Sequence, residues 1–200
     1  IYFEGIPVVK NNKISKENKI IKQIKTYLNF GLSGKLKEDI RCNNKLIYNM
    51  SIKTPNHSYQ GLFNIQYNIK PDKNEDVVKS LEIVMDNLNK LKTQLLDEKT
   101  VFNLYKQKRF RDAMTEDDIL DNTFNKCEEY VFANINSQYY KDEIKKSSSP
   151  KTKKNRSKDI TPKDIIKYSQ QIFNSSKMGV FIVSPKKINL DFGLSNNYYD

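Results

Sequence analysis

Apolar and polar residues alternate in two neighbouring stretches of the chain, which predicts two strands. Residues 63–70 alternate without interruption, a pattern typical of a sheet that is wetted on one side. The apolar positions there are Phe63, Ile65, Tyr67 and Ile69. Residues 46–54 alternate in the same way. The face expected to be buried there carries Leu46, Tyr48, Met50 and Ile52. A polar stretch at 55–60 separates the two, so the pattern predicts an antiparallel hairpin.

Apolar residues three and four positions apart predict helices on both sides of this hairpin. The first helix begins near Ser15, and a short second helix begins near Ser33. A long helix follows Pro71, where Asp72 and Glu75 have the spacing of a capping box. The apolar seam expected on the long helix is Val77, Leu81, Val84, Leu88 and Leu91.

The remaining elements complete a mixed fold. Helices are expected over residues 97–113 and 115–131, and after Thr161, where a cap, a proline and an acid follow in the order of a helix start. A strand is expected within residues 1–9, and a short buried strand over residues 179–183. This order predicts an α+β fold, a mainly antiparallel sheet of about four strands with helices packed on one face.

The basic charge of the chain is concentrated in one tract. The formal net charge is +11, and seven basic residues without an acid lie between Lys145 and Lys158, which leaves +4 for the rest. Serine and lysine runs predict a disordered insertion at 145–158. Aromatic residues do not interleave these charges, so nucleic-acid binding is disfavoured. No stretch is apolar for the roughly 20 residues that a membrane span needs.

The sequence is poor in residues for metal binding and nucleophilic catalysis. His57 is the one histidine, so neither a two-histidine metal site nor a Ser-His-Asp triad with a second histidine can be built. Cys42 and Cys127 form no spaced framework, and a reducing compartment is expected. Gly31 and Gly34 lie between expected helices rather than after a strand, which excludes a phosphate-binding loop.

The most specific signal lies in residues 32–51, which read LSGKLKEDIRCNNKLIYNMS. An expected helix delivers Arg41 at its end, a short turn follows, and the expected strand delivers Tyr48 seven residues later. This arrangement resembles the carboxyl-side domain of the insulinase (pitrilysin) family of zinc metallopeptidases, which includes the mitochondrial processing peptidases. In that family a glycine-rich turn, a Ser, a Leu and an Arg seven residues before a Tyr stand in this order.

The resemblance extends over residues 1–185 as a single domain, followed by a polar tail at 186–200. The long helix, the strand pair, the helix after Thr161 and the last strand also stand where the family has them. The glycine that the family usually has just before the Tyr is replaced by Leu46 or Ile47 here. Because the first residue is Ile rather than Met, we expect the chain to be part of a longer polypeptide.

The resemblance implies a role in peptide-bond hydrolysis. This chain would be the domain of a zinc metalloendopeptidase that bears no zinc, with Arg41 binding the substrate and Tyr48 stabilising the oxyanion. The zinc-binding His-x-x-Glu-His signature is absent. The zinc would therefore be held by a partner domain or subunit and not by this chain, which by itself would be inactive. The expected partners are that zinc-bearing domain or subunit and a peptide substrate.

Three other interpretations remain open from the residues alone. The chain could be a catalytically inactive relative that acts as a scaffold or substrate-guiding subunit. Arg41 at a helix end is also favoured by the helix dipole, and Tyr48 on an apolar strand face would be a core residue. A nucleic-acid binder that uses the 145–158 tract is the third interpretation.

Residues 147–158 contain no apolar side chain to bury, so we expect them to be dispensable for folding. Deletion of these residues should leave the melting temperature within a few degrees of the parent chain, as measured by circular dichroism. A large fall in melting temperature would show that the tract packs against the domain.

Overall fold

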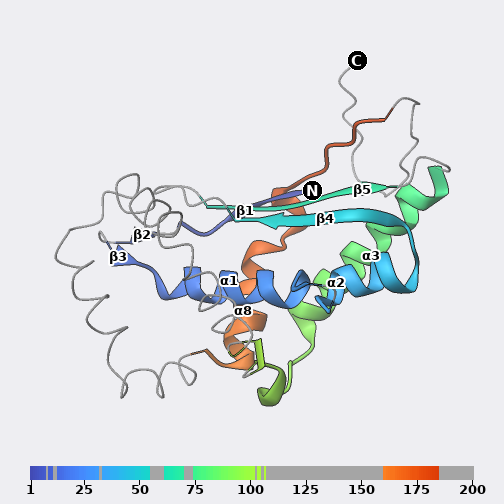
Figure 1. Ribbon diagram of the computed structural model, residues 1–200. Coiled ribbons are helices and arrows are strands. Elements are labelled where there is room, and N and C mark those ends of the chain that lie inside the picture. Colours follow the sequence, from blue (N-terminus) through green and yellow to red (C-terminus); the bar gives the residue numbers. More distant parts are fainter. Residues whose placement is uncertain are drawn as a thin grey trace, which may run out of the picture.

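A four-stranded antiparallel sheet with helices on one face is the centre of the computed structural model (Figure 1). The structure describes residues 1–7, 9–10, 13–31, 33–54, 61–69, 74–101, 103–104, 106 and 160–184. The strand order is β4-β5-β1-β6. The strands are β1 (Tyr2–Gly5), β4 (Ile47–Lys53), β5 (Gly61–Ile69) and β6 (Met178–Gly179). The predicted α+β class is confirmed, as is the antiparallel pairing of β4 with β5.

The described helices lie on one side of the sheet, and among the described elements none covers its other face (Figure 1). They are α1 (Lys16–Leu28), the short α2 (Lys35–Lys37), the π-helical segment η1 (Glu38–Asn43), α3 (Asn74–Thr93) and α8 (Pro162–Ile172). Residues 98–101 are also helical. A short 3-10 turn, η4 (Ser175–Lys177), leads into β6, and β2 (Val9–Lys10) pairs with β3 (Lys13–Ile14) in a separate two-stranded sheet.

Apolar side chains fill the layer between sheet and helices. The predicted seam of α3 is buried at every position, as are Leu36 and Ile40 of the second predicted helix. Phe173, at the end of α8, packs edge-to-face against Phe3 of β1 and Phe63 of β5, with ring centroids 5.3 and 5.1 Å apart. These rings join the last described helix to the two central strands.

The predicted helix starts are confirmed where the structure describes them. The Ser15 hydroxyl accepts a hydrogen bond from the Asn18 amide at 3.2 Å and caps α1. At α8, Thr161 and Asp164 form a reciprocal capping box with Pro162 in the first turn. A further set of predictions lies outside the described residues: Asp72 of the capping box, His57, Cys127, the helix at 115–131, the insertion at 145–158 and the tail at 186–200.

The predicted face of Tyr48 is wrong. Perfect alternation would bury Tyr48 with Met50 and Ile52, but the register of β4 against β5 shifts between Ile47 and Asn49. This shift is a β-bulge, in which one strand contains an extra residue. Ile47 and Met50 are therefore both buried, and Tyr48 is exposed.

The buried strand predicted at residues 179–183 is also wrong. Strand β6 consists of Met178 and Gly179, which pair with Phe3 and Tyr2. Beyond Gly179 the chain passes the start of β1, and Phe181 is 72% exposed. An apolar sequence at the edge of a sheet need not be buried, because it lacks the second neighbouring strand that a central position provides.

The strand predicted within residues 1–9 is shorter than expected. β1 ends at Gly5, which pairs with Gly61 of β5. A Cβ at Gly5 would lie 2.7 Å from the backbone of Gly61, and a Cβ at Gly61 would meet the backbone of Ile6. The two backbones approach so closely that glycine is required at both positions.

Two phenylalanines provide a matched test of this core. Phe173→Ala should reduce the free energy of unfolding by roughly 3–5 kcal/mol, because it removes a buried ring that contacts two strands. Phe181→Ala should change it by no more than about 0.5 kcal/mol, because that ring is exposed. Denaturant unfolding followed by circular dichroism measures both, and equal losses would contradict the described burial of residue 173.

Candidate functional site

The structure brings Arg41 and Tyr48, which are seven residues apart in the sequence, into contact. The guanidinium carbon of Arg41 lies 5.9 Å from the centroid of the Tyr48 ring. This separation is at the limit of the range for a cation–π interaction. Tyr48 is 75% exposed and Arg41 is partly exposed, so both can reach a ligand. The pair lies where η1 leads into β4.

Arg41 lies in η1, where the α-helical hydrogen-bond pattern of α2 changes to a π-helical one. Leu36 and Ile40 are fully buried and anchor the segment on the core. The Asn44 amide donates to the carbonyl of Asp39, five residues earlier, at 3.2 Å. The Asn44 side chain donates to the same carbonyl at 2.8 Å. Such π-helical turns are rare and frequently occur at functional sites.

The connection to β4 contains a second unusual conformation. Lys45 has a φ of 55°, in the left-handed region. For a residue with a side chain this costs on the order of 1–2 kcal/mol. The strand begins two residues later, at Ile47. The turn is therefore tight, and the surrounding core contacts must offset its cost.

The bulge at Tyr48 is the third irregularity and turns the ring out of the core. Pairing passes from Ile47 opposite Ile69 to Asn49 opposite Asn68, so Tyr48 is the extra residue of β4. The Met50 amide donates to the Asn49 side-chain oxygen at 2.8 Å, so a side chain satisfies this backbone donor beside the bulge. Bulges of this kind re-aim side chains and are over-represented next to active sites.

Asp39 connects the segment that carries Arg41 to its neighbours. Its carboxylate accepts hydrogen bonds from Lys35 Nζ at 2.8 Å, from Asn43 Nδ2 at 3.3 Å and from Asn87 Nδ2 of α3 at 3.1 Å. Burial alone would raise the pKa of Asp39, but the hydrogen bonds from Lys35 and Asn87 outweigh it. The pKa of Asp39 is consequently below its ordinary value of 3.8.

Sequence reasoning proposed Arg41 and Tyr48 as site residues and gave no role to Asp39 and Asn87, which the structure places beside them. A signal for Asn87 was present, because it lies three residues after Val84 and one before Leu88, within the apolar seam of α3. A carboxamide at such a position needs a buried hydrogen-bond partner. Nothing in the sequence indicated that this partner is Asp39.

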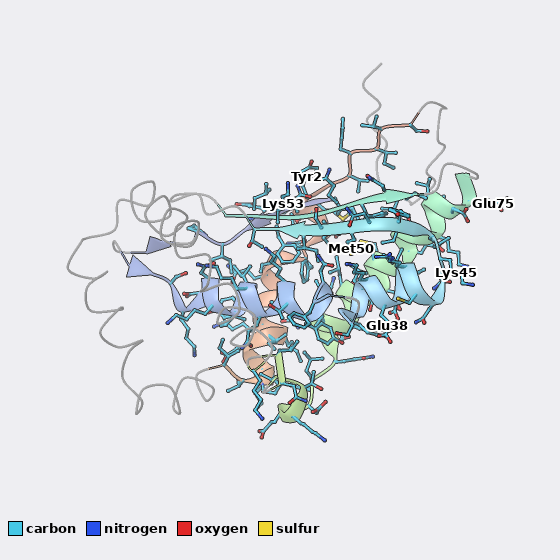
Figure 2. All side chains as sticks on the ribbon, viewed as in Figure 1. Tyr2, Glu38, Lys45, Met50, Lys53 and Glu75 are labelled. Carbon is cyan, nitrogen blue, oxygen red and sulfur yellow. The ribbon has the colours of Figure 1, made fainter. Side chains whose placement is uncertain are left out.

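The face of the sheet beyond the pair is mainly polar. Exposed or partly exposed side chains on it are Tyr2, Glu4, Asn49, Ser51, Lys53, Leu62, Asn64, Gln66 and Asn68. Figure 2 shows Tyr2 on the side away from the helices and Met50 on the side that faces them. Glu4 forms an ion pair with Lys177 at 2.7 Å. The face offers mainly neutral hydrogen-bonding groups.

The candidate site does not fit a metal ion. A guanidinium and a phenol are not zinc ligands, and zinc prefers thiolate, imidazole and carboxylate. Within the described ranges, no group of three or more His, Cys, Asp or Glu is placed to hold a metal. Cys42, on η1, is free and exposed.

Among the described helices, none is long and apolar enough to cross a membrane.

Comparison with known proteins identifies the fold. No family model matches the chain, and no curated protein matches it. A protease from Helicobacter pylori is similar in structure, with a TM-score of 0.63 and 13% sequence identity. A peptidase M16 inactive domain from Pseudomonas fluorescens is similar with a TM-score of 0.62 and 14% identity. Each similarity covers 88% of this chain and 38% of the other chain. The chain thus has an insulinase-like (M16-like) fold and spans well under half the length of these neighbours.

The lowered pKa of Asp39 predicts a specific response to acid. A carboxylate with a lower pKa in the folded state stabilises the fold above its unfolded pKa, near 4, and loses this effect as pH falls through the folded value. We expect Asp39→Asn to be about 1 kcal/mol less stable than the parent at neutral pH. This difference should close as pH falls below about 4.

Thermal melts of the two proteins across this pH range measure the effect. All other carboxylates are shared by both proteins, so the difference between their curves isolates Asp39. A difference that persists unchanged below the folded pKa would contradict the described hydrogen bonds.

Proposed function

We propose that this chain is the zinc-free domain of an insulinase-like zinc metalloendopeptidase, in which Arg41 and Tyr48 contact the peptide substrate. The observation that carries the proposal is the exposure of Tyr48 beside Arg41, which results from the bulge in β4. A tyrosine that served only the core would lie on the apolar face with Met50. Tyr48 lies outside that core and its hydroxyl is available for a ligand.

Tyr48 would act on the charge that develops during peptide hydrolysis. Its phenol is a hydrogen-bond donor, and fixed donors that are directed at a developing oxyanion lower the barrier of acyl transfer. The Arg41 guanidinium would bind a neighbouring backbone carbonyl of the substrate through its planar array of donors. Contact between the two side chains restricts both before the peptide arrives, which reduces the entropy lost on binding.

The metal in this proposal belongs to a partner domain or subunit. Zinc there would activate the attacking water. With one histidine in the whole sequence, this chain cannot supply the usual ligand set. The name of the Pseudomonas fluorescens neighbour, a peptidase M16 inactive domain, supports a role without a metal centre of its own.

The same name supports a second candidate function. The chain would then be a catalytically inactive relative that serves as a scaffold or guides substrates to another subunit. Arg41 and Tyr48 would bind peptide without assisting hydrolysis. A His-x-x-Glu-His signature in the parent polypeptide or in a co-purifying subunit favours the peptidase function, and degenerate metal ligands throughout favour the scaffold.

Tyr48→Phe in the zinc-containing parent enzyme tests the peptidase function. Loss of one oxyanion donor should reduce kcat by about 10²–10³-fold while the melting temperature barely changes. Tyr2→Phe is the matched control, because Tyr2 is an exposed tyrosine on the face of the same sheet away from the described helices and should retain full turnover. Unchanged turnover for Tyr48→Phe in an active enzyme would exclude this role for Tyr48.

Arg41→Lys should have a different kinetic effect. Lysine retains the charge but loses the planar array of donors, so peptide binding should weaken more than it does for Tyr48→Phe. Steady-state kinetics should show this as a raised KM. A KM equal to that of the parent would contradict direct contact between Arg41 and the peptide.

A further inference from the structure

One side-chain hydrogen bond joins the segment that carries Arg41 to the long helix α3. Asn87 Nδ2 donates to Asp39 Oδ2 at 3.1 Å, across 48 residues of sequence. Asn87 is 4% exposed. Its amide group also donates to the Ile83 carbonyl at 2.9 Å, so it has two acceptors and is held in one orientation. The partly exposed carboxylate of Asp39 therefore accepts from a buried donor of fixed orientation.

We propose that Asp39 and Asn87 are positioning residues that hold Arg41 against Tyr48. The proposal rests on the proposed function in taking Arg41 and Tyr48 as the peptide-binding pair. In this proposal neither Asp39 nor Asn87 contacts the peptide. Their role is to fix the position of the Arg41 guanidinium group.

Apolar packing alone does not determine this orientation. Leu36 and Ile40 hold the segment on the core, but apolar contacts are non-directional. A hydrogen bond has strict distance and angle requirements. Residues two positions apart in a helical segment lie on nearly opposite sides. A bond that directs Asp39 toward α3 therefore directs Arg41 away from α3, toward the ring of Tyr48.

Backbone carbonyls at and next to Asp39 hold the path of the chain from η1 to β4. The Asp39 carbonyl accepts both the backbone and the side-chain donors of Asn44, and the neighbouring carbonyl of Ile40 accepts the Leu46 amide at 3.0 Å. The side chain of Asp39 is further held by Lys35 and Asn43. The side chain of Asp39 thus orients η1, which carries Arg41 and leads into the turn before the strand of Tyr48.

The test measures the Arg41–Tyr48 contact directly in the chain by nuclear magnetic resonance. The parent should show a nuclear Overhauser effect between the Arg41 side chain and the Tyr48 ring, and an upfield ring-current shift of the Arg41 Hδ signals. In Asn87→Leu, which has a similar volume and no donor, the Overhauser effect should weaken severalfold. The Hδ signals should move back toward those of an unstructured arginine.

Ser80→Ala is the matched control. Ser80 is a fully buried polar residue of the same helix, bonded to the Val77 carbonyl at 2.8 Å and to the Tyr67 hydroxyl at 3.3 Å. Its loss should lower the melting temperature but leave the Arg41–Tyr48 signals unchanged. An intact contact in Asn87→Leu, or an equal loss of contact in Ser80→Ala, would overturn the proposal.

Asp39→Ala removes the acceptor of the hydrogen bond between Asn87 and Asp39. This variant provides the test if Asn87→Leu does not fold. It alters a side chain at the surface of η1 and should weaken the Overhauser effect as strongly as Asn87→Leu does. Retention of the contact in Asp39→Ala would also overturn the proposal. None of these measurements uses peptide hydrolysis, so their failure would leave the proposed function standing. An inactive parent protein would likewise not affect them.

Discussion

The need to bury one apolar face of β4 determines the geometry of the candidate site. The inward residues Ile47, Met50 and Ile52 are separated by three positions and then by two, whereas a regular strand needs two each time. In a regular strand either Ile47, or Met50 and Ile52 together, would face water. The free-energy cost would be about 1.5–3 kcal/mol for each exposed side chain. The extra residue in the bulge resolves this conflict. Tyr48 is that residue, and its exposure follows from the burial of its neighbours.

The unusual backbone of the described domain is concentrated in the short segment around this bulge. The π-helical turn, the left-handed Lys45 and the bulge follow one another between residues 38 and 49, and the preceding and following elements are regular. Each irregularity has a local cost, which the buried contacts of Ile40 and Ile47 help to offset. Strained geometry that persists in one segment is a basis for inferring a function there, because regular structure would be more stable.

Sequence periodicity predicted the elements whose burial is decided locally. The alternation in β5, the seam of α3 and the capping box of α8 are each set by residues close together in sequence, and each was confirmed. The face of Tyr48 could not be predicted, because a bulge depends on which residues of β5 lie opposite. The exposure of Phe181 likewise depends on how far β1 extends beside it.

The candidate site likewise contains residues that the sequence could indicate and contacts that it could not. Arg41 and Tyr48 could be proposed from their spacing and the resemblance that accompanies it, whereas the bond between Asp39 and Asn87 joins residues that only tertiary folding brings together. Long-range polar contacts of this kind have no periodic signal. A polar residue within an apolar seam indicates that a partner exists and does not identify it.

The bulge has a further consequence for how the domain behaves at high concentration. In the described sheet, β4 and β6 are the edge strands, and edge strands can pair with strands of other molecules and cause aggregation. A strand from another molecule that paired with β4 would lose its register at the bulge at Tyr48. The charge of Lys53, at the other end of β4, would also oppose such pairing. β6 offers two residues, too few for a stable ladder. The irregular strand that presents Tyr48 to a ligand therefore also hinders the domain from assembling, edge to edge, into fibrils.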